Sequence, residues 1–141
     1  TVNIDGFSHA AKLSKHPVMY NGDITNAETF FSLQKRFPDI TEWMIGRSAI
    51  DNPFIFEQIK GEVCTNQITR IMAFHEDLYS EYRKVLCSYS HVLDKMKEIW
   101  TYLGKSFTIA NRLLLQISQT KSLEAYEKTV NSIFNEGVWI A

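Results

Sequence analysis

Two short apolar runs near the start of the chain each end in a polar turn that carries a glycine. Residues 17–20 are followed by Asn21-Gly22-Asp23, and residues 43–45 are followed by Gly46-Arg47-Ser48. Apolar runs of this length that end in such turns are typical of β-strands. This repeated pattern limits what the first part of the chain can fold into.

The segment between the two runs is predicted to be a helix. Thr25 and Glu28 have the spacing at which a threonine hydroxyl and a glutamate cap each other's free backbone amides. Apolar residues then recur at roughly helical spacing, at Ala27, Phe30, Phe31 and Phe37. A strand, a helix and a second strand in this order predict a parallel pair joined by a crossover. Both glycine turns should therefore lie at one edge, where the carboxyl ends of the strands meet.

Such an edge suits an anion. Glycine lets the backbone approach a ligand closely, amides at the start of a following helix are free to donate, and an arginine can bind a phosphate through two parallel hydrogen bonds. In an eight-stranded βα barrel, phosphate commonly binds at the loops after the last two strands. The alternative is that Gly22 and Gly46 only form tight turns and that Arg47 is a solvated charge.

The residues around the turns form two longer motifs, His-Pro-Val-Met-Tyr-Asn-Gly-Asp-Ile at 16–24 and Trp-Met-Ile-Gly-Arg-Ser-Ala-Ile-Asp-Asn-Pro-Phe-Ile-Phe at 43–56. Together they resemble the end of the barrel in the tRNA-dihydrouridine synthases, which reduce uridines in tRNA with FMN that NADPH reduces in turn. The resemblance implies that FMN, chiefly its phosphate, is bound by Asn21, Gly22, Asp23, Gly46 and Arg47. Where the family usually has a glycine after the arginine, this chain has Ser48, which either narrows the backbone approach or adds a hydroxyl donor.

The length of the chain indicates a fragment. It has 141 residues and begins at Thr1, close to a helix predicted over residues 4–13, whereas a complete βα barrel needs about 250 residues. We expect residues 1–63 to hold the last two βα units of a truncated TIM barrel from a longer enzyme. In the family the catalytic cysteine lies in the N-terminal half, so the resemblance assigns no catalytic residue here, neither Cys64 nor Cys87.

Composition predicts a soluble, cytoplasmic protein without a metal. The chain is 45% hydrophobic and 22% charged, and it contains no apolar run long enough to span a bilayer and no secretory signal pattern. Cys64 and Cys87 lack metal-ligand spacing, and we expect reduced thiols rather than a disulfide. The histidines also lack the spacing of a metal or catalytic pair and are expected to be structural or surface residues: His9, His16, His75 and His91.

The second part of the chain is predicted to be helical. A short helix from Asn52-Pro53 to Gly61, expected to close the barrel portion, leads into four amphipathic helices. Their apolar positions run from Ile68 to Leu86, from Val92 to Leu103 (ending at Gly104), from Phe107 to Ile117, and, after Thr120 or Ser122, from Leu123 to Phe134 (ending at Gly137). Short connections between four helices predict an antiparallel four-helix bundle over residues 64–141.

Charge is unevenly distributed in this helical part. The net charge of −1 argues against indiscriminate nucleic-acid binding, but residues 83–121 carry seven Lys and Arg against two acidic residues, between acidic flanks. Residues 95–103 are similar to the basic, tryptophan-bearing helix of the tRNA-binding domain of the family. The candidate phosphate contacts are Lys95, Lys97, Lys105, Arg112, Arg83 and Lys84. The alternative is that these side chains simply face water, and Trp100, which lies in the apolar stripe, is expected in the core.

Two other functions stay open. A helical RNA-binding or protein-interaction module without a cofactor would not need the paired glycine turns. A flavin- or phosphate-binding barrel enzyme that acts on a small molecule would not need a basic bundle. We further expect the isolated chain to be inactive, to retain little FMN, and to self-associate through exposed barrel strands, because open strand edges are templates for pairing.

Overall fold

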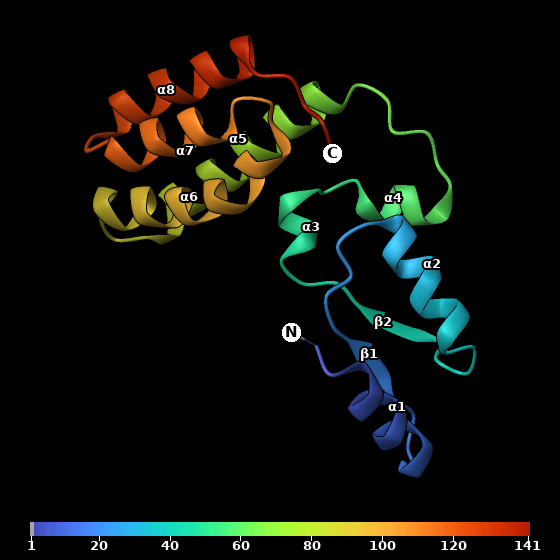
Figure 1. The fold of residues 1–141 in the computed structure, drawn as a ribbon. Helices are drawn as coiled ribbons and strands as arrows, with labels where there is room; N and C mark the ends of the chain where they lie inside the picture. The colour runs from blue at the N-terminus through green and yellow to red at the C-terminus, as the bar shows by residue number, and fades with distance from the viewer. Residues whose placement is uncertain (1) are drawn as a thin grey trace. The chain divides into compact units, whose positions relative to one another are not determined.

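A computed structural model describes residues 2–141, which divide into two compact units. The first unit runs to Ala49 and includes Phe54–Val63, and the second comprises Ile50–Pro53 and Cys64–Ala141. The chain first passes from one unit to the other inside a four-residue helix, α3 (Ser48–Asp51). This short helix therefore belongs to both units (Figure 1).

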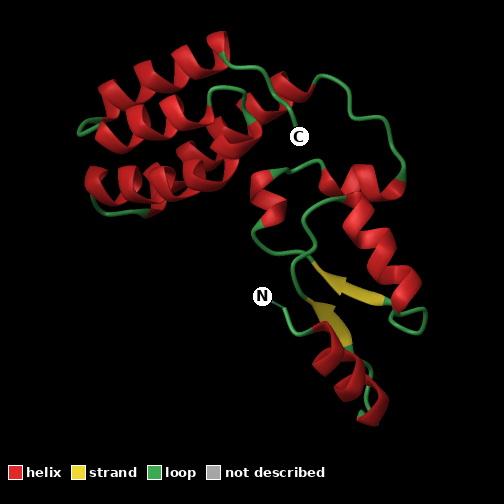
Figure 2. Ribbon diagram, viewed as in Figure 1, coloured by secondary structure: helices red, strands yellow, loops and turns green. Residues whose placement is uncertain are grey.

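The first unit is built on a two-stranded parallel sheet. Its elements are α1 (Ile4–Leu13), β1 (Met19–Asn21), α2 (Ala27–Arg36), β2 (Glu42–Met44) and α4 (Ile55–Lys60), of which α4 contacts α2 (Figure 2). Tyr20 pairs in register with Trp43, and both side chains face a core to which α1 and α2 contribute. The predicted parallel pair and the predicted first helix are confirmed.

Aromatic rings fill the core of this unit. Phe7 of α1 meets Tyr20 edge to face with ring centroids 4.8 Å apart, and Phe30 of α2 meets Trp43 in the same way at 5.2 Å. Such pairs add about 0.5–1.5 kcal/mol to the area that they bury. On the alternate strand positions Met19 and Met44 remain exposed, because successive side chains of a strand point to opposite faces. One face of the sheet is therefore packed, and the other carries these two methionines.

The structure corrects the predicted start of α2. The N-cap is Asn26, whose side-chain oxygen accepts a hydrogen bond from the Thr29 amide at 2.8 Å, and it is not Thr25. Asparagine is the better N-cap of the two residue types. Phe31, predicted on the inner face, is 47% exposed, and Leu33 is buried instead.

The predicted start of the next helix is also wrong. Asn52 and Pro53 precede α4, which begins at Ile55 with Phe54 at the N-cap position. Asn52 is buried instead of capping a helix at the surface. The predicted end is confirmed, because Gly61 has φ 73°, a left-handed conformation that glycine adopts without steric cost.

Four long helices make up most of the second unit, as predicted. They are α5 (Gln67–Val85), α6 (Tyr89–Leu103), α7 (Ala110–Gln119) and α8 (Leu123–Glu136), with a 3-10 turn, η1 (Gly104–Ser106), between α6 and α7. Helix α6 contacts each of the other three. Its residues Met96, Trp100 and Leu103 are fully buried, so α6 lies at the centre of the core.

The end of the chain is paired with the connection between α6 and α7. Phe107, predicted inside the third helix, precedes it and forms an antiparallel bridge with Trp139. The Thr108 amide donates to the Val138 carbonyl at 3.0 Å, and the Ile140 amide donates to the Ser106 carbonyl at 2.9 Å. Of these residues only Trp139 is buried, so its side chain joins the end of the chain to the core of the unit.

Candidate functional site

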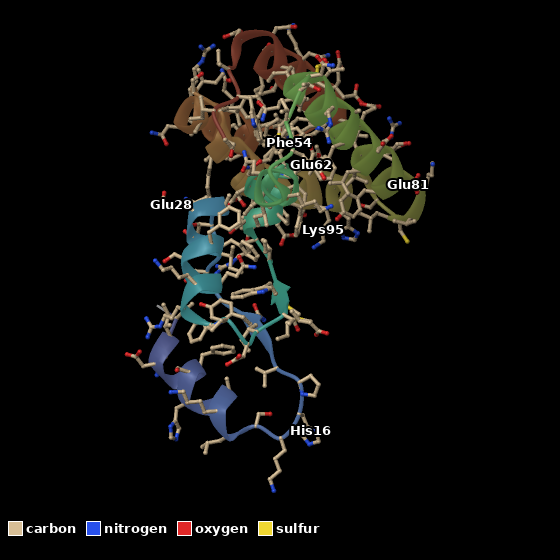
Figure 3. The ribbon with its side chains drawn as sticks, turned by 90° about the vertical axis from the view of Figure 1, so that its right-hand side faces the viewer. His16, Glu28, Phe54, Glu62, Glu81 and Lys95 are labelled. Carbon is tan, nitrogen blue, oxygen red and sulfur yellow. The ribbon has the colours of Figure 1, made fainter. Side chains whose placement is uncertain are left out.

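The two glycine turns lie at the same edge of the sheet. Strand β1 ends at Asn21 and β2 ends at Met44, and the parallel register places these residues opposite each other. The turns that follow are on the side where α2 begins. Figure 3 shows Glu28 in that first turn of α2 and His16 at the other end of the unit.

An ion pair connects the two turns. The Arg47 guanidinium lies 3.7 Å from the Asp23 carboxylate, and the two side chains are 75% and 59% exposed. An exposed pair at this distance is worth less than about 1 kcal/mol. Arg47 therefore keeps free donors for a second anion at this edge.

The two glycines differ in what surrounds them. A Cβ atom at Gly22 would lie 2.6 Å from the hydroxyl of Tyr20, a buried side chain, so the fold itself requires glycine there. A Cβ at Gly46 would meet nothing within 4 Å. The backbone at Gly46 is therefore open to a ligand, and the open backbone beside an available arginine fits the phosphate of a flavin nucleotide.

Helix termini contribute less to this edge than the sequence suggested. The first turn of α2 is separated from Gly22 by residues 23–26, and its Thr29 amide is already bonded to Asn26. Helix α3, which follows Arg47, has only four residues. Among the described residues, the backbone of the two turns and the side chain of Arg47 are therefore the chief candidates for binding an anion.

Five of the six predicted RNA contacts are paired with carboxylates of the same unit. The pairs are Arg83 with Glu127 at 3.8 Å, Lys84 with Glu81 at 2.6 Å, Lys95 with Glu98 at 2.9 Å, Lys105 with Asp51 at 3.3 Å, and Arg112 with Glu136 at 3.3 Å. Three of these acids lie in the segments that are acidic flanks in the sequence: Glu81, Glu127 and Glu136. Folding therefore brings the acidic flanks onto the basic segment and screens much of its charge.

Lys97 differs from the other five. Its ammonium donates to the Thr120 carbonyl at 2.7 Å, at the carboxyl-terminal end of α7. A carbonyl oxygen leaves the positive charge of the lysine in place, and Lys121 follows at an exposed position. The start of the turn between α7 and α8 therefore carries two lysine charges.

A buried polar cluster joins α5, α6 and α8. The Trp100 indole donates to the Tyr126 hydroxyl oxygen at 2.9 Å, and that hydroxyl lies 2.6 Å from His75 Nε2. The indole can only donate, and the buried Tyr126 hydroxyl can donate in turn to His75 in the neutral tautomer whose Nε2 is unprotonated. Trp100 is thus a core residue, as predicted, and no RNA base can stack on it.

Burial shifts the titration of this cluster. It lowers the pKa of His75 from 6.5 to about 4 and raises the pKa of Tyr126. The pKa of the neighbouring Tyr79 rises to about 12, first through burial and then through the hydrogen bond that it donates to Glu127 at 2.8 Å. From the sequence His75 was expected only to be a structural or surface residue, because its partner Tyr126 lies 51 residues further along the chain.

The two cysteines are not joined by a disulfide bond. Cys64 is partly buried and Cys87 is exposed. Over residues 2–141, no cluster of three or more His, Cys, Asp and Glu side chains is arranged to bind a metal ion. In the same range, every helix is too short or too polar to cross a membrane.

Two comparisons with known proteins cover this edge and the helices that follow it. The family model described as dihydrouridine synthase matches residues 10–137. A protein of Bacillus subtilis (strain 168) named "Probable tRNA-dihydrouridine synthase 2" is 30% identical over 104 residues, which are 74% of this chain and 31% of that protein. The chain thus spans about a third of the length of this relative. Since the matched region includes both glycine turns and all four long helices, the chain belongs to the dihydrouridine synthase family.

Proposed function

We propose that this chain is part of a flavin-dependent tRNA-dihydrouridine synthase, which reduces uridine to dihydrouridine in tRNA with FMN as cofactor and NADPH as reductant. Membership of the family and the name of the Bacillus subtilis relative support the proposal. The enzyme would act in the cytoplasm, where thiols such as Cys64 and Cys87 stay reduced.

The observation that carries the proposal is the pair of glycine turns at one sheet edge, connected by Arg47 and Asp23 at 3.7 Å. In this proposal Arg47 and the open backbone at Gly46 bind the FMN phosphate, Asp23 orients the guanidinium, and Asn21 and Gly22 complete the turn. When bound, FMN supplies the hydride for the uracil ring. The protein contributes position and charge at this edge.

The same proposal explains the two units. Residues 1–63 would be the last two βα units of a TIM barrel, whose loops at this edge commonly bind phosphate, and residues 64–141 an antiparallel four-helix bundle that binds tRNA. The catalytic cysteine and the remaining flavin contacts would lie outside these 141 residues. We therefore expect the isolated chain to be inactive and to purify without a flavin absorbance band.

Substitutions in the full-length protein test the cofactor site. Arg47→Ala should weaken FMN binding at least about tenfold, because a charge-assisted hydrogen bond contributes about 1.5–3 kcal/mol. Gly46→Ala should also weaken binding while leaving the melting temperature unchanged, because its Cβ meets nothing within the protein. Lys35→Ala, at an exposed position of α2, is the control. Unchanged flavin affinity in Arg47→Ala would exclude this phosphate site.

Binding of unmodified tRNA to the chain across a salt series tests the helical unit. Lys97→Gln with Lys121→Gln should weaken binding and lower the slope of log K against log salt by about 2, since each lost phosphate contact lowers it by about 1. The control pair is Lys84→Gln with Lys95→Gln, whose lysines are held by Glu81 and Glu98. Equal losses of tRNA affinity in both double variants would show that binding depends on the overall positive charge and not on Lys97 and Lys121. The absence of tRNA binding at low salt would contradict a tRNA site on these helices.

A further inference from the structure

A cavity lies between α5 and α8 in the second unit. Its volume is about 330 Å³, and a smaller hollow of about 270 Å³ adjoins it. The two share four lining residues: His75, Glu76, Val130 and Asn131. Helix α6 contacts both α5 and α8, so all the elements that build the cavity belong to one unit. A cavity of this volume is at the lower end of the range of small-molecule sites.

The cavity combines a buried aromatic floor with a polar rim. His75 and Tyr126 are 4% and 0% exposed, and their rings are stacked with centroids 5.9 Å apart. Glu76 on α5 and Asn131 on α8 are exposed. This combination suits a planar heterocycle, because such a ring has apolar faces and a polar edge.

His75 offers one hydrogen-bond donor to this cavity. Its Nε2 bonds the Tyr126 hydroxyl, and the neutral tautomer that accepts from this hydroxyl carries its proton on Nδ1. Among residues 2–141 no group bonds Nδ1, and in the same range no buried side-chain nitrogen or oxygen lacks a partner. Nδ1 is therefore not buried, and it can donate to a ligand in the cavity that His75 lines. A matching ligand must present an acceptor such as a carbonyl oxygen.

The two carboxylates of the cavity differ in their partners. Glu127 accepts a hydrogen bond from Tyr79 at 2.8 Å and pairs with Arg83 at 3.8 Å. Glu76 has no hydrogen bond or ion pair through its side chain within the described part of the chain. Its carboxylate is therefore available to accept from a ligand, which must present N–H groups as well as the acceptor for His75.

These requirements narrow the class of ligand. The charged residues that line the cavity are Glu76, Glu127 and Arg83, a net charge of −1, which disfavours an anion. A simple ammonium ion has no acceptor for the His75 donor. Guanine meets both requirements, because its O6 accepts while its N1–H and 2-amino groups can both donate to one carboxylate. Adenine has no carbonyl oxygen and cannot present this edge.

We propose that the cavity between α5 and α8 is a binding site for a guanine base, in which His75 donates to the carbonyl oxygen and Glu76 accepts from the N–H groups. This inference goes beyond the proposed function and does not depend on it. A free nucleoside and an unpaired base of RNA carry the same chemistry, and the experiments below separate these two sources.

The first experiment titrates guanosine into the 141-residue chain and follows the ring resonances of His75 by NMR. These resonances should shift, whereas those of the exposed His91 should not. Glu76→Gln should weaken guanosine binding about tenfold, because hydrogen bonds to a carboxylate are stronger than those to an amide. Asp77→Asn, at the next exposed position of α5 and outside the cavity, is the matched control. Unmoved His75 resonances in a guanosine-saturated solution would overturn the inference, as would equal shifts with adenosine.

A second pair of variants tests the place of binding. Asn131→Phe should abolish guanosine binding, because the larger side chain fills the cavity from α8. Ser132→Phe, at the neighbouring exposed position outside the cavity, should leave the affinity unchanged. Unchanged affinity in Asn131→Phe would place the ligand elsewhere and would contradict the proposed site.

Two short RNAs distinguish the sources of the base. One has a single guanine in the middle of four adenines, and the other contains five adenines and should leave the His75 resonances unchanged. If RNA is the source, the guanine-containing RNA should bind about tenfold more tightly than guanosine, because neighbouring bases add stacking contacts. Equal or weaker binding of that RNA would identify the free nucleoside as the ligand. Both results support the site, whereas equal binding of the two RNAs would contradict recognition of guanine.

Discussion

His75 is the residue whose chemistry is altered most by the fold. Its ring is 4% exposed and lies among the rings of Tyr79, Trp100, Tyr126 and Phe134. The neutral imidazole with an unprotonated Nε2 accepts a hydrogen bond from the Tyr126 hydroxyl, whereas a protonated imidazole would present a second donor to that hydroxyl. The folded state therefore selects neutral histidine.

This selection predicts a loss of stability in mild acid. The pKa of His75 is lowered from 6.5 to about 4, so below pH 6.5 the unfolded chain binds a proton that the folded chain excludes. Stability is fully present above pH 6.5 and should fall by up to about 3 kcal/mol as pH decreases to 4. Urea unfolding of the chain between pH 4 and 7.5 measures this loss.

A substitution separates His75 from other titrating groups. In His75→Phe the residue no longer titrates, so the slope of unfolding free energy against pH between 4 and 6.5 should become smaller, although stability at pH 7.5 also falls. His91→Gln, at an exposed position, should keep the original slope. The same slope in His75→Phe and in the parent would assign the acid sensitivity to other groups.

At the scale of elements, α2 offers a direct test of its observed start. Asn26→Ala should destabilise the first unit by about 1 kcal/mol, because the Thr29 amide loses its partner. Thr25→Ala should cost less, since Thr25 makes only a 3.4 Å contact with the Thr29 hydroxyl. The indole signal of Trp43, which packs against Phe30 in this unit, reports unfolding in urea. A larger loss of stability in Thr25→Ala than in Asn26→Ala would instead support the capping box predicted from the sequence.

Most elements could be predicted because their signals are local. Apolar periodicity and glycine punctuation indicated the parallel pair and the four long helices, and Gly61 and Gly104 end helices as expected. Exact starts were harder to predict, because Thr25 and Asn26 are both acceptable N-caps and only the structure shows which of them bonds the Thr29 amide. The position of Phe107 depends on its pairing with Trp139, a contact that no local pattern predicts.

The candidate site, too, could be predicted only where local sequence patterns determine it. The shared edge of the two glycine turns follows from strand order alone, so it was accessible to sequence reasoning. The pairing of Arg83 with Glu127 and of Arg112 with Glu136 joins residues far apart in the chain. A charge count along the sequence treats these groups as separate blocks and overstates the positive charge of the folded surface.

At the scale of the whole molecule, the uncovered sheet face predicts self-association of the isolated chain. Met19 is 42% exposed and Met44 45%, and both lie on the face opposite the packed core. Burying a methionine fully contributes about 1.5–3 kcal/mol. Met19→Lys with Met44→Lys should therefore weaken association at least about tenfold in sedimentation equilibrium.

Met72→Lys is the matched control for this experiment, because Met72 is 44% exposed but lies on α5 in the second unit. It should leave the association constant unchanged. A parent chain that sediments as a monomer at every concentration would contradict the prediction, as would equal effects of the substitutions in both units.

The pairing of Phe107 with Trp139 has a consequence for how the second unit opens. It joins the two ends of the segment that contains α7 and α8, so these helices lie within one closed loop of the chain. Fluctuations of native proteins open contiguous segments together. The amides of Thr108 and Ile140 are bonded across this junction, so their hydrogen exchange should report a single opening event of that loop.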